Sequence, residues 1–275
     1  MNGSTLVSTG ELAANLVKWR VFDCRHDLAK PDLGEEQYKQ GHIPGALFAH
    51  LDRDLSARKT GKNGRHPLPE PQDFEKWLEK TGLAPKDQAV CYDAGPGAMA
   101  ARLWWMLRWI GHEKVAVLDG GFAKWTREGR PVSIDVPLFT PLNYPIKLQK
   151  DFAADVRAVE KTKSLLLDAR APARYRGEQE PIDPVAGRIP GAKNRFNMDN
   201  LTPEGTFKPA PALKQELEAA LQGRQPSEVI HYCGSGVAAC HNLLAMEVAG
   251  LKGGKLYAGS WSEWSADPKR PQERG

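Results

Sequence analysis

The chain has 275 residues, a formal net charge of +4 and 26% charged residues. Domains typically hold about 100 to 150 residues, so this length predicts two, and the 41% hydrophobic content excludes extensive disorder. No apolar run approaches the ~18 residues of a membrane span, no signal-peptide pattern opens the chain and no Lys/Arg run marks a nucleic-acid surface. We therefore expect a cytoplasmic protein without membrane or nucleic-acid partners, whose mild positive charge suits a small anionic substrate.

Helices and strands alternate through the first half. Ser8 to Glu11 is a capping-box pattern that opens a short helix, and Trp19 to Asp23 reads as a strand. A turn-rich stretch follows, and Arg53 to Pro71 is a basic loop without periodicity. The later elements of this half are a helix over 71–81, a strand over 88–92, an apolar helix over 98–110 and a strand over 115–118.

Prolines mark a boundary near the middle of the chain. Pro131, Pro137, Pro141 and Pro145 fall in a segment without periodicity, which predicts an extended linker over residues 132–149. An N-terminal domain would then span residues 1–131 and a C-terminal domain residues 150–275. The last nine residues, from Asp267, are predicted to form a frayed tail.

The second half repeats the first. Val21 to Arg25 corresponds to Leu166 to Arg170, and Ile43 to Ala46 corresponds to Ile189 to Ala192. Alternation of strands and helices predicts an open parallel sheet with helices on both faces in each half. Features found in both copies serve the fold, so we interpret the Asp and Arg residues of the first motif pair as structural ion pairs.

The stretch from Glu228 to Cys240 predicts a strand, a tight glycine loop and the start of a helix, with Cys233 at the junction. Unpaired N–H groups and the helix dipole would stabilise a thiolate there. The first half carries Asp93 at the matching position, so only the second half can perform sulfur chemistry. The four cysteines contain no C-x-x-C pair, and we expect neither a metal nor a disulfide framework. Cys240 is either a core residue or a redox partner of Cys233.

Two arginines occur only in the second copy. Arg174 falls on an alanine of the first half and Arg188 on a histidine. A guanidinium can grip a carboxylate or sulfonate through two hydrogen bonds, so Arg174 is either an anion-binding group or a solvated surface residue. A cysteine phosphatase is nearly excluded, because its loop needs an arginine where this chain has Ala239.

Several motifs resemble the two-domain rhodanese-like sulfurtransferases, closest to the 3-mercaptopyruvate and thiosulfate enzymes. They are Asp-Ala-Arg followed by Arg-Tyr-x-Gly, the Ile-Pro-Gly-Ala turn and the loop Cys233 to Val237. The resemblance implies tandem rhodanese-like domains and a catalytic Cys233 that takes sulfane sulfur from a small anionic donor and forms a persulfide. It implies no cofactor, and an acceptor that is cyanide or a thiol, such as a small thiol or a thioredoxin-like protein.

The neutral loop after the cysteine resembles that of the 3-mercaptopyruvate enzymes. Asp52, His66 and Ser235 match the Asp-His-Ser relay of those enzymes, and Arg174 matches a carboxylate-binding arginine. We expect Arg174 and Arg188 to bind the donor. The loop amides that we expect to cradle the persulfide are those of Gly234, Gly236 and Val237.

Three departures leave the donor open. Ala238 replaces a threonine of the loop motif, Arg188 replaces a histidine, and Ile182 replaces a second carboxylate-binding arginine. Arg188 or the basic loop with Arg58 and Arg65 could compensate for that loss. We therefore expect transfer from 3-mercaptopyruvate, with thiosulfate as the alternative donor and a non-catalytic sulfur carrier or regulatory module as the alternative of another class.

Overall fold

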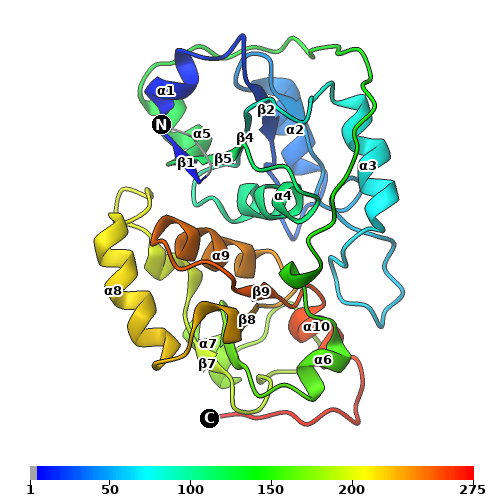
Figure 1. Ribbon diagram of the computed structural model, residues 1–275, viewed down its shortest axis with the longest axis vertical. Helices are drawn as coiled ribbons and strands as arrows, with labels where there is room; N and C mark the ends of the chain where they lie inside the picture. Colours follow the sequence, from blue (N-terminus) through cyan, green and yellow to red (C-terminus); the bar gives the residue numbers. More distant parts are fainter. Residues whose placement is uncertain (1–4) are drawn as a thin grey trace. The chain divides into compact units, whose positions relative to one another are not determined.

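The computed structural model describes residues 5–275, and these form two compact units, neither continuous in sequence (Figure 1). Each unit takes one short segment from the opposite half of the chain. The first unit comprises residues up to Ala57, Pro69–Gln149 and Pro203–Phe207; the second comprises Arg58–Leu68, Lys150–Thr202 and Lys208–Gly275.

The first unit contains a parallel five-stranded sheet in the order β1-β5-β4-β2-β3. Its strands are β1 (Leu6–Val7), β2 (Arg20–Asp23), β3 (Leu47–Phe48), β4 (Ala89–Tyr92) and β5 (Val115–Leu118). Its helices are α1 (Thr9–Ala13), α2 (Leu33–Gln40), α3 (Pro71–Lys80), α4 (Ala98–Trp109) and α5 (Gly121–Arg127).

The second unit contains a parallel four-stranded sheet in the order β7-β6-β8-β9. Its strands are β6 (Leu165–Asp168), β7 (Lys193–Asn194), β8 (Val229–Tyr232) and β9 (Lys255–Leu256). Its α-helices are α6 (Val156–Glu160), α7 (Pro172–Arg176), α8 (Ala210–Leu221), α9 (Ala238–Val248) and α10 (Ser260–Trp264), and its 3-10 helices are η1 (Lys150–Phe152), η2 (Asn197–Asn200) and η3 (Pro226–Glu228). The expected class, two tandem α/β units with parallel sheets flanked by helices, is confirmed.

The repeat extends to side-chain contacts. Arg25 donates to the Asp23 carboxylate at 2.6 Å, and Arg170 donates to the Asp168 carboxylate at the same distance. Each guanidinium also donates at 2.7 Å to a backbone carbonyl, which is that of Gly41 in the first copy and that of Gly187 in the second. All four charged side chains are buried. The prediction that these pairs are structural is confirmed.

The ends of the two copies match as well. Trp125 in α5 donates its indole N–H to the Pro131 carbonyl at 2.8 Å, and Trp264 in α10 donates to the Pro271 carbonyl at 2.8 Å. Both tryptophans belong to the apolar cores of their units. A buried indole needs such a partner, so each copy closes on the same contact.

Three expectations about local structure were wrong or incomplete. The turn-rich stretch contains α2, and β1, which pairs with β5, was not anticipated. The C-terminal residues are not frayed, because Arg188 and Glu273 form an antiparallel backbone bridge and an ion pair.

Within residues 5–275, every helix is too short or too polar to cross a bilayer.

Candidate active site

Cys233 directly follows β8 and is the first residue of the loop that leads into α9. Its side chain is buried. The N–H of Gly236 donates to its sulfur at 3.1 Å. Gly236 has φ +79°, and a Cβ there would lie 2.5 Å from the Ala258 carbonyl oxygen, so only glycine fits. The predicted strand, glycine loop and helix are present, and the Gly236 N–H is directed at the sulfur, as an anion at a helix N-terminus requires.

The matching loop of the first unit shows what this backbone holds. Oδ1 of Asp93 accepts from the N–H groups of Gly95 and Gly97 at 3.0 Å each, and Oδ2 accepts from Met99 at 2.9 Å and Ala100 at 3.3 Å. Burial raises the pKa of the Asp93 carboxyl, and these N–H groups oppose that effect. The repeated loop is thus a cradle for one negative charge, occupied by a fixed carboxylate in one copy and by a thiol in the other.

His66 and Ser235 meet beside Cys233. The His66 Nδ1 lies 2.8 Å from the Ser235 Oγ, and both side chains are buried. The segment Arg58–Leu68, which carries His66, belongs to the second unit, where the Arg65 backbone N–H donates to the Ser262 side chain in α10 at 3.0 Å. Asp52 belongs to the first unit, so its part in a triad stays a prediction.

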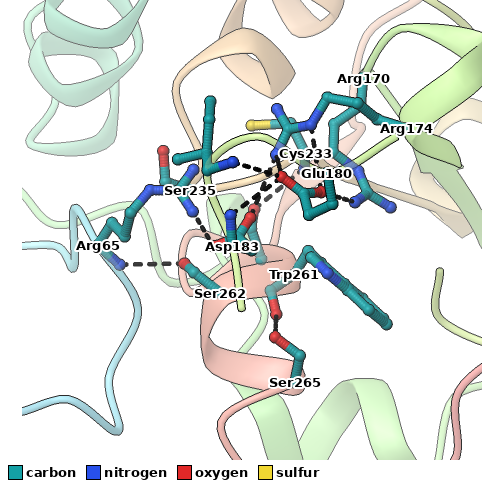
Figure 2. A network of polar contacts seen from close by, with 12 residues as sticks. Arg65, Arg170, Arg174, Glu180, Asp183, Cys233, Ser235, Trp261, Ser262 and Ser265 are labelled. Carbon is teal, nitrogen blue, oxygen red and sulfur yellow. Dashed lines mark hydrogen bonds and ion pairs between the residues drawn. The ribbon is translucent and has the colours of Figure 1, made fainter. Parts of the chain in front are cut away.

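Arg174 in α7 already binds carboxylates of this chain (Figure 2). Its guanidinium donates to Glu180 at 2.6 and 3.2 Å and to Asp183 at 3.2 Å. Glu180 also accepts from Arg170 at 3.3 Å. Arg174 is therefore part of a partly buried network of charges and not a solvated surface residue.

Arg65 completes this network, and sequence reasoning placed it only in a basic loop that could compensate for Ile182. Its guanidinium pairs with the Asp183 carboxylate, on the opposite oxygen from Arg174. A Cβ added to Gly234 would lie 2.8 Å from Arg65 Nη2 and 3.4 Å from Arg174 Nη2. Burial lowers the pKa of Arg65, and the Cys233 charge opposes this effect. Two guanidiniums thus face the residue that follows the candidate nucleophile.

Arg188 has different partners. Its guanidinium pairs with Glu273 and donates to the backbone carbonyl of Gly275 at 2.5 Å, and its charge lies 4.5 Å from the Tyr175 ring centroid. These contacts fix the C-terminal segment to the second unit. The structure does not bring Arg188 together with the Cys233 loop through any contact described for it.

Cys240, one of four free cysteines, supports the loop. Its thiol donates to the Gly236 carbonyl at 3.2 Å, and its side chain is fully buried. Of the two roles considered for it, these contacts favour the core residue.

Among the described residues of the first unit, His26, His50 and Asp52 form a grouping with metal-ligand chemistry, because their ligand atoms lie within 4.8 Å of one another. The His50 Nδ1 accepts from the backbone N–H groups of Asp52 at 3.1 Å and Arg53 at 3.3 Å. This keeps the ring proton on Nε2, which makes that nitrogen a donor and not a ligand. Burial also lowers the pKa of His50. We therefore assign no ion to these residues.

The two units are parallel α/β folds, and the second carries a cysteine at a strand-to-helix junction, so the chain is a two-domain α/β protein with a candidate cysteine nucleophile. The chain belongs to the rhodanese family, because the rhodanese-like domain matches residues 8–128 and 153–267. The expected family membership is confirmed.

Proteins named as sulfurtransferases are similar to this chain over most of its length. It is 45% identical to a "Probable 3-mercaptopyruvate sulfurtransferase" of Pseudomonas aeruginosa, with full coverage of both chains. It is 32% identical to a thiosulfate sulfurtransferase of Mus musculus, covering 94% of this chain and 88% of the relative. The solved 3-mercaptopyruvate sulfurtransferase of Leishmania major superposes with a TM-score of 0.89 at 30% identity, covering 98% of this chain and 76% of that one.

Proposed function

We propose that this chain transfers sulfane sulfur from 3-mercaptopyruvate to a thiol or cyanide through a persulfide on Cys233. The observation that carries the choice of donor is the buried hydrogen-bonded pair of His66 and Ser235 in the nucleophile's loop. The names of the similar proteins from Pseudomonas aeruginosa and Leishmania major support the same donor.

In this proposal the Cys233 thiolate attacks the sulfur of the donor. A sulfur–sulfur bond forms, the carbon–sulfur bond breaks, and its electron pair stays on the carbon as the enolate of pyruvate. Ser235 delivers a proton to that carbon and recovers one from the His66 imidazolium, a general-acid arrangement. The N–H of Gly236 lies where it can hold the persulfide anion.

In the second half-reaction an acceptor thiolate attacks the outer sulfur of the persulfide. The acceptor leaves with that sulfur, and the Cys233 thiolate is restored, which predicts ping-pong kinetics. We propose a small thiol or a thioredoxin-like protein as acceptor. All four cysteines are free and buried, which suits a reducing compartment such as the cytoplasm.

Thiosulfate would use the same nucleophile but would release sulfite. Sulfite is a stable anion that needs no proton, so a buried proton relay has no task in that reaction. The relay therefore favours 3-mercaptopyruvate over thiosulfate.

Steady-state turnover of 3-mercaptopyruvate and thiosulfate with cyanide, measured side by side, tests the proposal. We expect 3-mercaptopyruvate to give the higher kcat/KM, and mass spectrometry to show one added sulfur atom after donor alone. Cys233→Ser should lose both signals, and Cys240→Ser serves as the matched control. Turnover surviving in Cys233→Ser refutes the nucleophile, a preference for thiosulfate refutes the donor, and a persulfide without turnover indicates a carrier.

A further inference from the structure

The Asp183 carboxylate lies between two arginines beside the Cys233 loop. Arg65 pairs with Oδ1, and Arg174 Nη2 lies 3.2 Å from Oδ2. The Asp183 side chain is 2% exposed, whereas those of Arg65 and Arg174 are 24% and 17% exposed. One carboxylate thus bridges two guanidiniums that retain access to solvent, which is the contact that a carboxylate donor would make.

The charges of this network balance before any donor enters. Its cations are Arg65, Arg170 and Arg174, and its anions are Asp168, Glu180 and Asp183. No positive charge is left over for an anionic donor, and ionisation of Cys233 adds one negative charge. Binding of a donor anion therefore costs less free energy when one of these carboxylates leaves.

Asp183 is the carboxylate best placed to leave. Asp168 lies at the end of β6 and receives three guanidinium contacts from Arg170 within 3.1 Å, and Glu180 accepts from two guanidiniums and from the backbone N–H groups of Ile182 and Asp183. The contacts described for the Asp183 carboxylate come from side chains alone. Long arginine side chains can exchange one anion for another without any change in the backbone that carries them.

Asp183 also lies on a loop with glycines at both ends. Gly177 has φ +75° and Gly187 has φ +129°, and a Cβ on Gly177 would lie 3.2 Å from the Gly187 Cα. The loop between them contains no helix or strand and is closed at its base, which is the form of an Ω-loop. Only glycine adopts both φ values without strain, so these two residues can serve as hinges.

We propose that Arg65 and Arg174 form a two-arginine clamp for the donor carboxylate, and that Asp183 occupies this clamp in the resting protein and leaves when the donor binds. This inference rests on the proposed function. It accounts for Ile182, because Arg65 supplies the second guanidinium from a distant segment of the chain. Donor binds only to molecules whose clamp is free of Asp183. The apparent donor affinity is therefore the intrinsic affinity multiplied by the fraction of molecules with a free clamp.

Asp183→Asn tests the occupant. The amide keeps the size of the side chain but not its charge, so we expect KM for 3-mercaptopyruvate to fall about tenfold, the effect of one charge-assisted hydrogen bond lost by the competing group. Glu178→Gln is the matched control: it removes the same charge from the same loop, but Glu178 pairs with the exposed Arg176. An unchanged or higher KM in Asp183→Asn, or an equal fall in Glu178→Gln, overturns the inference.

Arg65→Gln tests the clamp from the other side. We expect it to raise KM at least about tenfold with a smaller change in kcat, because a ground-state contact is lost. Lys62→Gln removes the same charge from an exposed position of the same segment and is the control. A KM for Arg65→Gln within about twofold of the Lys62→Gln value refutes a role for Arg65 in donor binding.

Calorimetric binding of pyruvate to Cys233→Ser separates this inference from the proposed function. Pyruvate carries the carboxylate but no transferable sulfur, so its affinity reports the clamp alone. Tighter binding on adding Asp183→Asn and weaker binding on adding Arg65→Gln support the clamp, even if the protein prefers thiosulfate as donor. Affinities that stay constant in both variants overturn the clamp, even if 3-mercaptopyruvate is turned over.

Discussion

Removal of the His66 imidazole should separate the two sulfur donors. His66 Nδ1 lies 2.8 Å from Ser235 Oγ, and the two side chains are only 3% and 4% exposed, so water cannot readily replace the ring as a proton source. General-acid catalysis by a positioned side chain contributes about 10²- to 10⁴-fold. We expect His66→Ala to lower 3-mercaptopyruvate turnover by about 10²-fold or more, because the enolate must be protonated. Thiosulfate turnover should fall much less, because sulfite leaves without a proton.

Single-turnover formation of pyruvate and of sulfite measures the chemical step for each donor. Ser235→Ala should reproduce the loss, and the double variant should be little worse than either single one, since the residues act as a unit. Ser262→Ala is the control, because it removes the contact that anchors the Arg58–Leu68 segment but keeps the imidazole. Equal losses for both donors in His66→Ala would mean that the ring only positions the loop, and would refute the relay.

Two further predictions concern the folded state. Asp93→Asn should lower the free energy of unfolding by about 2 to 3 kcal/mol in urea titrations, because an amide offers one acceptor oxygen to N–H groups that now bind two; an unchanged value would contradict the cradle. His231 is buried and has no hydrogen-bond partner among residues 5–275, and burial lowers its pKa to about 3. As pH falls below about 6.5 the unfolded state therefore takes up the proton first and stability declines. Between pH 7 and pH 5 the wild type should lose about 2 kcal/mol more than His231→Leu, and parallel pH curves would contradict the assignment.

The Cys233 loop could be predicted from sequence because its signals are local. Residues that favour a strand, two glycines and small helix-forming residues lie within a dozen positions, and each group favours one backbone conformation. The ion pairs of Asp23 and Asp168 were equally accessible, because the repeat showed which residues both copies keep. In both cases the evidence lies within one supersecondary unit.

Contacts between residues far apart in the sequence could not be predicted in this way. Arg65 and Asp183 are 118 positions apart, and no local pattern links a basic loop to an acidic one. Glu273 lies 85 positions from Arg188, so the polar composition of the C-terminal residues suggested a frayed tail where the fold provides a partner. Helix α2 carries few apolar residues and gave too weak a periodicity.

Two carboxylates of this chain occupy anion sites, and the way each is held decides what it can do. Asp93 receives four backbone N–H groups from the loop before α4 and from its first turn, so its replacement leaves N–H groups of this backbone without their acceptor and lowers stability. Asp183 lies on a loop with glycine hinges at both ends, and its carboxylate accepts from two long arginine side chains. Another anion can therefore take its place. Neutralising Asp93 should therefore affect stability more than donor affinity, and neutralising Asp183 should affect donor affinity more than stability. The Cys233 cradle lies beside the exchangeable site, where a donor carboxylate and its sulfur can be bound together.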